Sequence, residues 1–153
     1  MTTTLNEDFR DLLQVFVEGD VQFLIVGAYA LAVHGLPRAT GDLEVWIEPT
    51  PQNASRAYAA LARFGAPLAD LAEQDLATPG TVFQIGVIPR RIDVLTQLTG
   101  VDFAAAWPHR ITSTYAQIQF PVIGRDELIE NKRATGRPKD LVDLDALNQL
   151  PRG

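Results

Sequence analysis

The sequence has no cysteine and only two histidines among its 153 residues. The absence of thiols excludes disulfide bonds, thiolate zinc sites and cysteine nucleophiles. With His34 and His109 as the only imidazoles, a histidine-rich metal site is disfavoured as well. The formal net charge is −6, whereas proteins that wrap duplex DNA without sequence preference are usually basic. We therefore expect no duplex DNA partner.

Long apolar runs are missing too. No stretch approaches the roughly 18–20 apolar residues of a membrane span. The first ten residues, MTTTLNEDFR, are polar and acidic and lack the basic start and apolar run of a signal peptide. We therefore expect a cytoplasmic protein without membrane contact. A content of 46% apolar and 21% charged residues is ordinary for a globular chain, and we assign residues 1–153 to one domain.

Apolar periodicity predicts an α/β (α+β) fold with one mixed β-sheet flanked by helices. Strands are expected over 22–27, 42–48, 81–87, 90–96 and within 111–123, and the third and fourth should form a hairpin. Helices are expected over 5–18, 28–34, 51–64, 67–75, 101–107, 125–135 and 138–149. Leucines at 141, 144 and 147 predict an apolar edge on the last helix.

Three acids fall on predicted strands. Asp42 and Glu44 are two residues apart, so their side chains point to the same face with Cα atoms roughly 6.6 Å apart. Asp93 stands between apolar residues on another strand. If these strands are neighbours, the three carboxylates converge and could hold two metal ions about 3.5–4 Å apart. Mg²⁺ is a natural candidate because it prefers carboxylate and water oxygen.

Each acid also has a simpler interpretation. A pair of acids two residues apart is usually a solvent-facing strand surface, and Asp93 could form a salt bridge with Arg90 or Arg91. The third strand acid and an upstream glycine favour the metal interpretation. That glycine, Gly27, ends a predicted strand and with Ala28 opens a short helix, a junction that presents free backbone N–H groups to an anion. A tight turn is the simpler alternative there.

Together these motifs resemble the nucleotidyltransferase superfamily with the polymerase-β-like fold. The matching stretches are Val26-Gly27-Ala28, Asp42-Leu43-Glu44-Val45 and Ile92-Asp93-Val94. The longer stretches FLIVGAYALAVHGLPRATGDLEVWI and LIENKRATGRPKDLVDLDAL resemble a bacterial branch of minimal nucleotidyltransferase-like proteins, some of which belong to toxin–antitoxin or phage-defence pairs. The resemblance covers residues 20–150. Two positions depart from it: Ala28 stands where serine or glycine is usual, and Glu44 where aspartate is commoner.

The resemblance implies roles for individual residues. Asp42, Glu44 and Asp93 would be both catalytic residues and metal ligands. The nucleotide-binding residues would be Gly27, Ala28, Arg38, Thr40 and Lys132.

The basic residues have structural alternatives. Arg38 could instead pair with Asp42 or Glu44 and hold the loop. Arg137 and Lys139 could bind a polyanion such as RNA, although a structural role is favoured for them.

Four further side chains are assigned structural roles. His34 is expected to be hydrogen-bonded rather than catalytic, and Tyr29 to pack in the core. Trp46 and Trp107 are expected in the core or in a pocket wall.

The resulting hypothesis is a nucleotidyltransferase that uses Mg²⁺ (or Mn²⁺) to move a nucleotidyl group from an NTP. The acceptor would be a hydroxyl of RNA, protein or a small molecule. A second hypothesis, favoured by Ala28 and Glu44, is an inactive protein of the same fold that binds a cognate partner protein. A third is a nucleotide sensor that binds NTP and metal without transfer.

Overall fold

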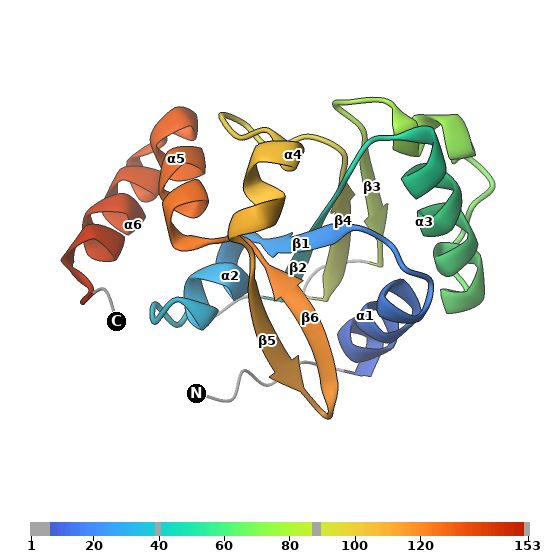
Figure 1. The fold of residues 1–153 in the computed structure, drawn as a ribbon, viewed down its shortest axis with the longest axis horizontal. Helices are drawn as coiled ribbons and strands as arrows, with labels where there is room; N and C mark the ends of the chain where they lie inside the picture. Colours follow the sequence, from blue (N-terminus) through green and yellow to red (C-terminus); the bar gives the residue numbers. More distant parts are fainter. Residues whose placement is uncertain (1–6, 39–40, 87–89, 152–153) are drawn as a thin grey trace.

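The computed structural model describes residues 7–38, 41–86 and 90–151. In this part of the chain the strands form one six-stranded sheet in the order β3-β4-β2-β1-β6-β5 (Figure 1). β1 is antiparallel to β2 and parallel to β6, and β2 is parallel to β4. β3–β4 and β5–β6 are antiparallel hairpins. The strands are β1 (Phe23–Val26), β2 (Asp42–Ile47), β3 (Val82–Ile85), β4 (Arg91–Leu95), β5 (Ile111–Tyr115) and β6 (Ile118–Val122).

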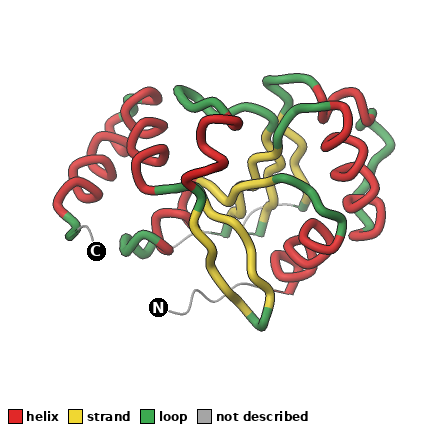
Figure 2. The backbone as a smooth tube through the Cα atoms, in the orientation of Figure 1, coloured by secondary structure: helices red, strands yellow, loops and turns green. Residues whose placement is uncertain are grey.

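The described helices lie outside this mixed sheet, which confirms the predicted α/β class. α1 and α3 pack together on one side of the sheet, and α5 and α6 form a pair on the other side (Figure 2). The α-helices are α1 (Glu7–Glu18), α2 (Gly27–Val33), α3 (Pro51–Phe64), α4 (Phe103–Ala106), α5 (Arg125–Thr135) and α6 (Pro138–Gln149). Two 3₁₀ helices, η1 (Glu73–Ala77) and η2 (Trp107–His109), complete the set.

The alternation of β2 decides which face of the sheet forms the main core. Leu43, Val45 and Ile47 are buried on one face. Phe23 of β1 pairs with Ile47 and therefore shares this face. Its ring meets Phe16 of α1 edge-on at 5.4 Å, so α1 covers this side. The opposite face carries Asp42 and Glu44.

Local sequence signals explain the bounds of α3. Thr50 is the N-cap and its hydroxyl accepts a hydrogen bond from the backbone N–H of Asn53. Pro51 occupies the first turn, where its missing N–H costs nothing. Gly65 ends the helix in the left-handed region at φ 92°. These three features set the bounds of the helix expected over 51–64.

The structure corrects other boundaries. Within 67–75 only the end is helical, as the start of η1, and the helix predicted over 101–107 is divided between α4 and η2. The β-rich segment 111–123 turns back at Ala116 and Gln117, which both have positive φ. The predicted apolar edge of α6 is wrong at Leu141, whose side chain is 51% exposed. Among the described helices, none combines the length and apolarity needed to cross a membrane.

Candidate active site

The three predicted acids lie on adjacent strands and share one face of the sheet. Glu44 of β2 pairs with Asp93 of β4 on one side and with Val26 of β1 on the other. Asp42 pairs with Arg91, two residues before Asp93. Cross-strand partners project to the same side, so β2 and β4 place Asp42, Glu44 and Asp93 together. Their assignment as catalytic metal ligands stays a prediction.

The Gly27 turn lies directly against Glu44. Gly27 has φ +71°, a conformation that side chains disfavour. A Cβ at this position would lie only 1.8 Å from Oε2 of Glu44. The absence of a side chain at residue 27 therefore lets the Glu44 carboxylate pack against the start of α2. Ala28 follows in the same turn, where a phosphate is expected from the sequence.

The acids disturb one another electrostatically. Burial raises the pKa of Glu44, and the charges of Asp93 and Asp42 raise it further. Burial also raises the pKa of Asp93, with Arg91 acting against this shift and Asp42 adding to it. Ionisation of Glu44 and Asp93 is therefore less favourable in the folded protein than in water, and a nearby positive charge would make it more favourable.

Arg91 supplies one positive charge. Its Nη2 lies 3.3 Å from Oδ2 of Asp42, and its Nε lies 3.1 Å from Oδ1 of Asp93. The salt bridge between Asp93 and Arg91 is thus one of the two alternatives set out from the sequence. Within residues 7–38, 41–86 and 90–151, no three histidine, cysteine or acidic side chains are arranged to hold a metal ion. The donor chemistry suits Mg²⁺, but the arginine engages two of the three carboxylates.

Positive charge also faces Glu44 from the α5–α6 pair. Lys132 and Lys139 act to lower the pKa of Glu44, and the charge of Glu44 acts to raise the pKa of Arg137. Lys132 comes from α5 and the other two flank the start of α6. The predicted nucleotide-side lysine therefore lies within electrostatic reach of the acids.

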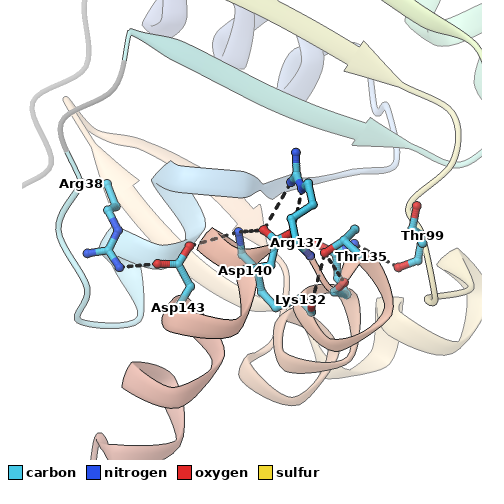
Figure 3. A network of polar contacts seen from close by, with 8 residues as sticks. Arg38, Thr99, Lys132, Thr135, Arg137, Asp140 and Asp143 are labelled. Carbon is cyan, nitrogen blue, oxygen red and sulfur yellow. Dashed lines mark hydrogen bonds and ion pairs between the residues drawn. The ribbon is translucent and has the colours of Figure 1, made fainter.

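Lys132 is held in an ion network that the sequence analysis did not predict. Its Nζ lies 3.4 Å from Oδ1 of Asp140 and 3.4 Å from Oδ2 of Asp143 (Figure 3). Asp143 also pairs with Arg38, and Asp140 with Arg137. We call these five residues the α5–α6 network. Its alternating charges run from the loop before β2 to the start of α6.

Asp140 is the centre of this network. Its side chain is fully buried and accepts hydrogen bonds from the backbone N–H of Arg137 at 3.2 Å and from Nε of Arg137 at 2.6 Å. Burial alone would raise the pKa of Asp140. Hydrogen bonds from Arg137 and Thr135, together with the charge of Lys132, instead hold that pKa far below its usual range. Asp140 therefore stays ionised and fixes the junction between α5 and α6.

The remaining sequence assignments divide between confirmed contacts and corrections. Arg38 pairs with Asp143 and not with Asp42 or Glu44, so the structural alternative named the wrong partner. Thr40 lies outside the described residues. His34 is hydrogen-bonded, with Nε2 2.8 Å from the carbonyl oxygen of Ile123, as expected for a structural role.

The aromatic side chains take the predicted packing roles. Tyr29 meets Phe9 edge-on at 5.6 Å, and Trp46 meets Phe103 at 4.9 Å. The ring of Trp107 stacks on Phe103.

Sequence reasoning missed the contact of Arg91 with Asp42, and it missed Asp140 and Asp143 as partners of Lys132. A signal for the latter pair was present. Asp140 and Asp143 are three residues apart on a predicted helix and would share its face. They directly follow a segment with four cations, which could have indicated an ion network.

Comparison with solved structures identifies the fold of the chain that carries this site. A candidate nucleotidyltransferase from Thermotoga maritima, TM1012, superimposes with a TM-score of 0.61 at 11% identity, covering 93% of this chain and 91% of that one. The lincosamide antibiotic adenylyltransferase LnuA, bound to lincomycin, gives a TM-score of 0.58 at 12% identity, covering 97% and 100%. ANT(2'')-Ia, in complex with adenylyl-2''-tobramycin, gives 0.60 at 13% identity, covering 91% and 84%.

These similarities extend over nearly the whole chain, and the protein has the nucleotidyltransferase fold. At such low identity they establish the fold alone. No protein-family model and no curated sequence matches the chain.

Proposed function

We propose that this protein is a metal-dependent nucleotidyltransferase, which moves a nucleotidyl group from an NTP to a hydroxyl of an acceptor. One observation carries the proposal. The Glu44 carboxylate lies against the Gly27 turn, in register with Asp93, and faces cations from α5 and α6. The site therefore combines a carboxylate cluster with positive charge for phosphates. Its fold is shared with a lincosamide antibiotic adenylyltransferase and with ANT(2'')-Ia, which was solved in complex with adenylyl-2''-tobramycin.

Asp42 and Glu44 would hold the divalent cation, with Asp93 as a third ligand. When bound, Mg²⁺ or Mn²⁺ supplies charge neutralisation for the phosphates and lowers the pKa of a bound hydroxyl. Burial raises the pKa values of Glu44 and Asp93, and repulsion from neighbouring acids raises them further; a bound cation would relieve this repulsion. The backbone of Gly27 and Ala28 would approach the phosphates closely because neither residue carries a large side chain.

The reaction would form one bond and break one. The acceptor hydroxyl oxygen bonds to the α-phosphorus of the NTP, and the bond from that phosphorus to the bridging oxygen of the pyrophosphate breaks. Asp93 would take the hydroxyl proton, since it lies beside the proposed ligands Asp42 and Glu44 on the same face of the sheet. Lys132 and Lys139 would stabilise the negative charge of the phosphate chain.

The acceptor would approach over β3. Gln84 pairs with Asp93 across the β3–β4 hairpin and therefore lies on the same face, and its side chain is exposed. Val82, two residues earlier, is 56% exposed on that face. This surface offers an amide and an apolar contact next to the proposed base. Because the two antibiotic-related neighbours were solved with lincomycin and with adenylyl-2''-tobramycin, we propose a hydroxylated small molecule as the acceptor, with RNA and protein hydroxyls as alternatives.

Calorimetric titration of ATP and GTP, each with Mg²⁺, Mn²⁺ or neither, tests the nucleotide site. We expect metal-dependent binding to the wild type and none to Asp42→Ala/Glu44→Ala. The matched control is Asp70→Ala/Glu73→Ala, which removes two exposed acids outside the site. Transfer is then measured with α-³²P-labelled NTP on a lincosamide, an aminoglycoside, tRNA and total protein. Absence of transfer by the wild type would refute the proposed enzyme, and binding without transfer would identify a nucleotide sensor instead.

A second candidate function is that of a non-catalytic partner-binding protein, such as one member of a toxin–antitoxin or phage-defence pair. The observation that favours it is the exposure of Leu141 and Val142 side by side on the outer surface of α6. A cognate protein that buries them should be captured by the wild type and lost with Leu141→Ser/Val142→Ser. Retained NTP binding in that variant would separate the two functions.

A further inference from the structure

Arg91 holds an unusual position in the acid cluster. It is the first residue of β4 and lies in register with Asp42 of β2. Its side chain is 27% exposed and touches one oxygen of Asp42 and one of Asp93. A single guanidinium thus joins carboxylates from the two parallel strands at the centre of the site.

Asp42 and Asp93 are also two of the three carboxylates proposed to hold a divalent cation. Guanidinium nitrogens and a metal ion cannot both occupy the space beside Oδ2 of Asp42 and Oδ1 of Asp93. Both are positively charged, so they repel each other even when they are side by side. Arg91 and a metal therefore compete for Asp42 and Asp93 by contact and by charge.

We infer that Arg91 is a positioning residue that occupies the place of the metal in the metal-free protein and must leave Asp42 and Asp93 before a divalent cation binds. This inference rests on the proposed function, because it concerns the cation of that reaction. Arg91 keeps the like-charged acids together while the site is metal-free, and it sets the concentration of metal at which the site fills.

A purely structural salt bridge would act in the opposite direction. If Arg91 only held the carboxylates in ligating positions, its removal would loosen them and weaken metal binding. If it competes with the metal, its removal takes the guanidinium away from two ligands and removes one positive charge, and metal binding tightens. The sign of the change in metal affinity thus separates the two roles without any measurement of activity.

The test is Mn²⁺ binding, followed by electron paramagnetic resonance of the free ion and by calorimetry, in the absence of nucleotide. For Arg91→Gln we expect about tenfold tighter binding than for the wild type, as expected from removing a like charge a few ångströms away in a partly exposed site. Arg90→Gln is the matched control, since Arg90 is the adjacent exposed arginine and its loss changes the net charge equally. Binding to Arg90→Gln should stay close to the wild type.

Thermal unfolding provides the second measurement. Without metal, Arg91→Gln should melt below the wild type because Asp42 and Asp93 lose their shared counter-ion. Saturating Mn²⁺ should then raise its melting temperature by more than it raises that of the wild type. If Arg91→Gln does not fold, Arg91→Lys replaces two guanidinium contacts with one ammonium. This variant should bind Mn²⁺ a few-fold more tightly than the wild type, because a single ammonium competes less well for two carboxylates than a planar guanidinium.

Unchanged or weaker Mn²⁺ binding in the Arg91 variants overturns the inference. The proposed function fails separately. Tighter Mn²⁺ binding in Arg91→Gln with no nucleotidyl transfer by any variant leaves the inference standing and refutes the enzyme. If the wild type transfers nucleotide but the wild type and Arg91→Gln bind Mn²⁺ equally well, the inference about Arg91 is refuted and the proposed function stands.

Discussion

Replacement of Asp140 by asparagine should destabilise the protein by about 3 kcal/mol at pH 7. Removing one partner of a buried ion pair typically lowers the free energy of unfolding by about 3–5 kcal/mol. Asp140 is completely buried, and its loss leaves Lys132 and Arg137 without a shared counter-ion. Two features place the cost at the lower end. Lys132 keeps Asp143, and the side chain of Arg137 is 60% exposed, so water can solvate it.

The dependence of this effect on pH has a definite sign. The pKa of Asp140 in the folded protein lies far below the ordinary value of about 3.9 for an unfolded aspartate. A depressed folded pKa contributes stability above the unfolded pKa, and that stability is lost as the pH falls. The wild type therefore begins to lose this contribution below about pH 4 and loses the rest as the pH falls toward the folded pKa, while the asparagine variant has none to lose. The difference between the two proteins should shrink from pH 7 to pH 3.

Urea unfolding followed by circular dichroism at pH 7, 5 and 3 measures both effects. Asp145→Asn is the matched control, because Asp145 lies on the same helix with an exposed side chain. A loss below about 1 kcal/mol at pH 7, or a difference that does not change with pH, would contradict the assignment of Asp140 as the centre of the network.

Two further changes test the acid cluster. Glu44→Gln should raise the urea midpoint at pH 7 without metal. The raised pKa of Glu44 means that its ionised form opposes folding above that pKa. The gain in stability should vanish below about pH 4, where the carboxyl is protonated in both the folded and the unfolded state. The same variant should lose Mn²⁺ binding, and a lower midpoint would show that Glu44 stabilises the metal-free fold instead. Gly27→Ala should cost about 1–2 kcal/mol in unfolding free energy from its left-handed backbone, and its methyl group must push the Glu44 carboxylate away, so Mn²⁺ binding should weaken as well. Wild-type Mn²⁺ affinity in Gly27→Ala would mean that the contact with Glu44 does not position that side chain.

The face shared by the acids could be predicted from the sequence because strand alternation has a period of two. Asp42 and Glu44 followed from this rule, and the strand around Asp93 supplied the third acid. The same rule placed Trp46 with the acids, yet its ring is buried, because Phe103 of α4 packs on it. Trp46 and Phe103 are 57 positions apart in the sequence, so no local pattern in β2 predicts their contact.

The error on α6 has a different cause. Its leucines suggested an apolar edge, but the helix turns Asp140 and Asp143 inward to meet Lys132, which leaves Leu141 outward. Charged residues are rarely buried unless paired, so apolar periodicity ranks them as exposed. Only the position of α5 beside α6 shows that a lysine lies on the inner side. The contact of Arg91 with Asp42 escaped prediction similarly, since it depends on the parallel register of β2 and β4.

The acids of the site lie on the sheet and the cations on the last two helices, which affects the order in which the site forms during synthesis and folding. The carboxylates are complete once the chain reaches Asp93, whereas the facing cations follow only with residues 132–139. A chain emerging from the ribosome therefore carries the negative half of the site first, with Arg91 as its early counter-ion. Because Glu44 and Lys132 are separated by most of the chain, their approach carries a large loop-closure cost. The site should thus be assembled late in folding, and a released fragment without α5 and α6 would lack the charges proposed to hold a nucleotide.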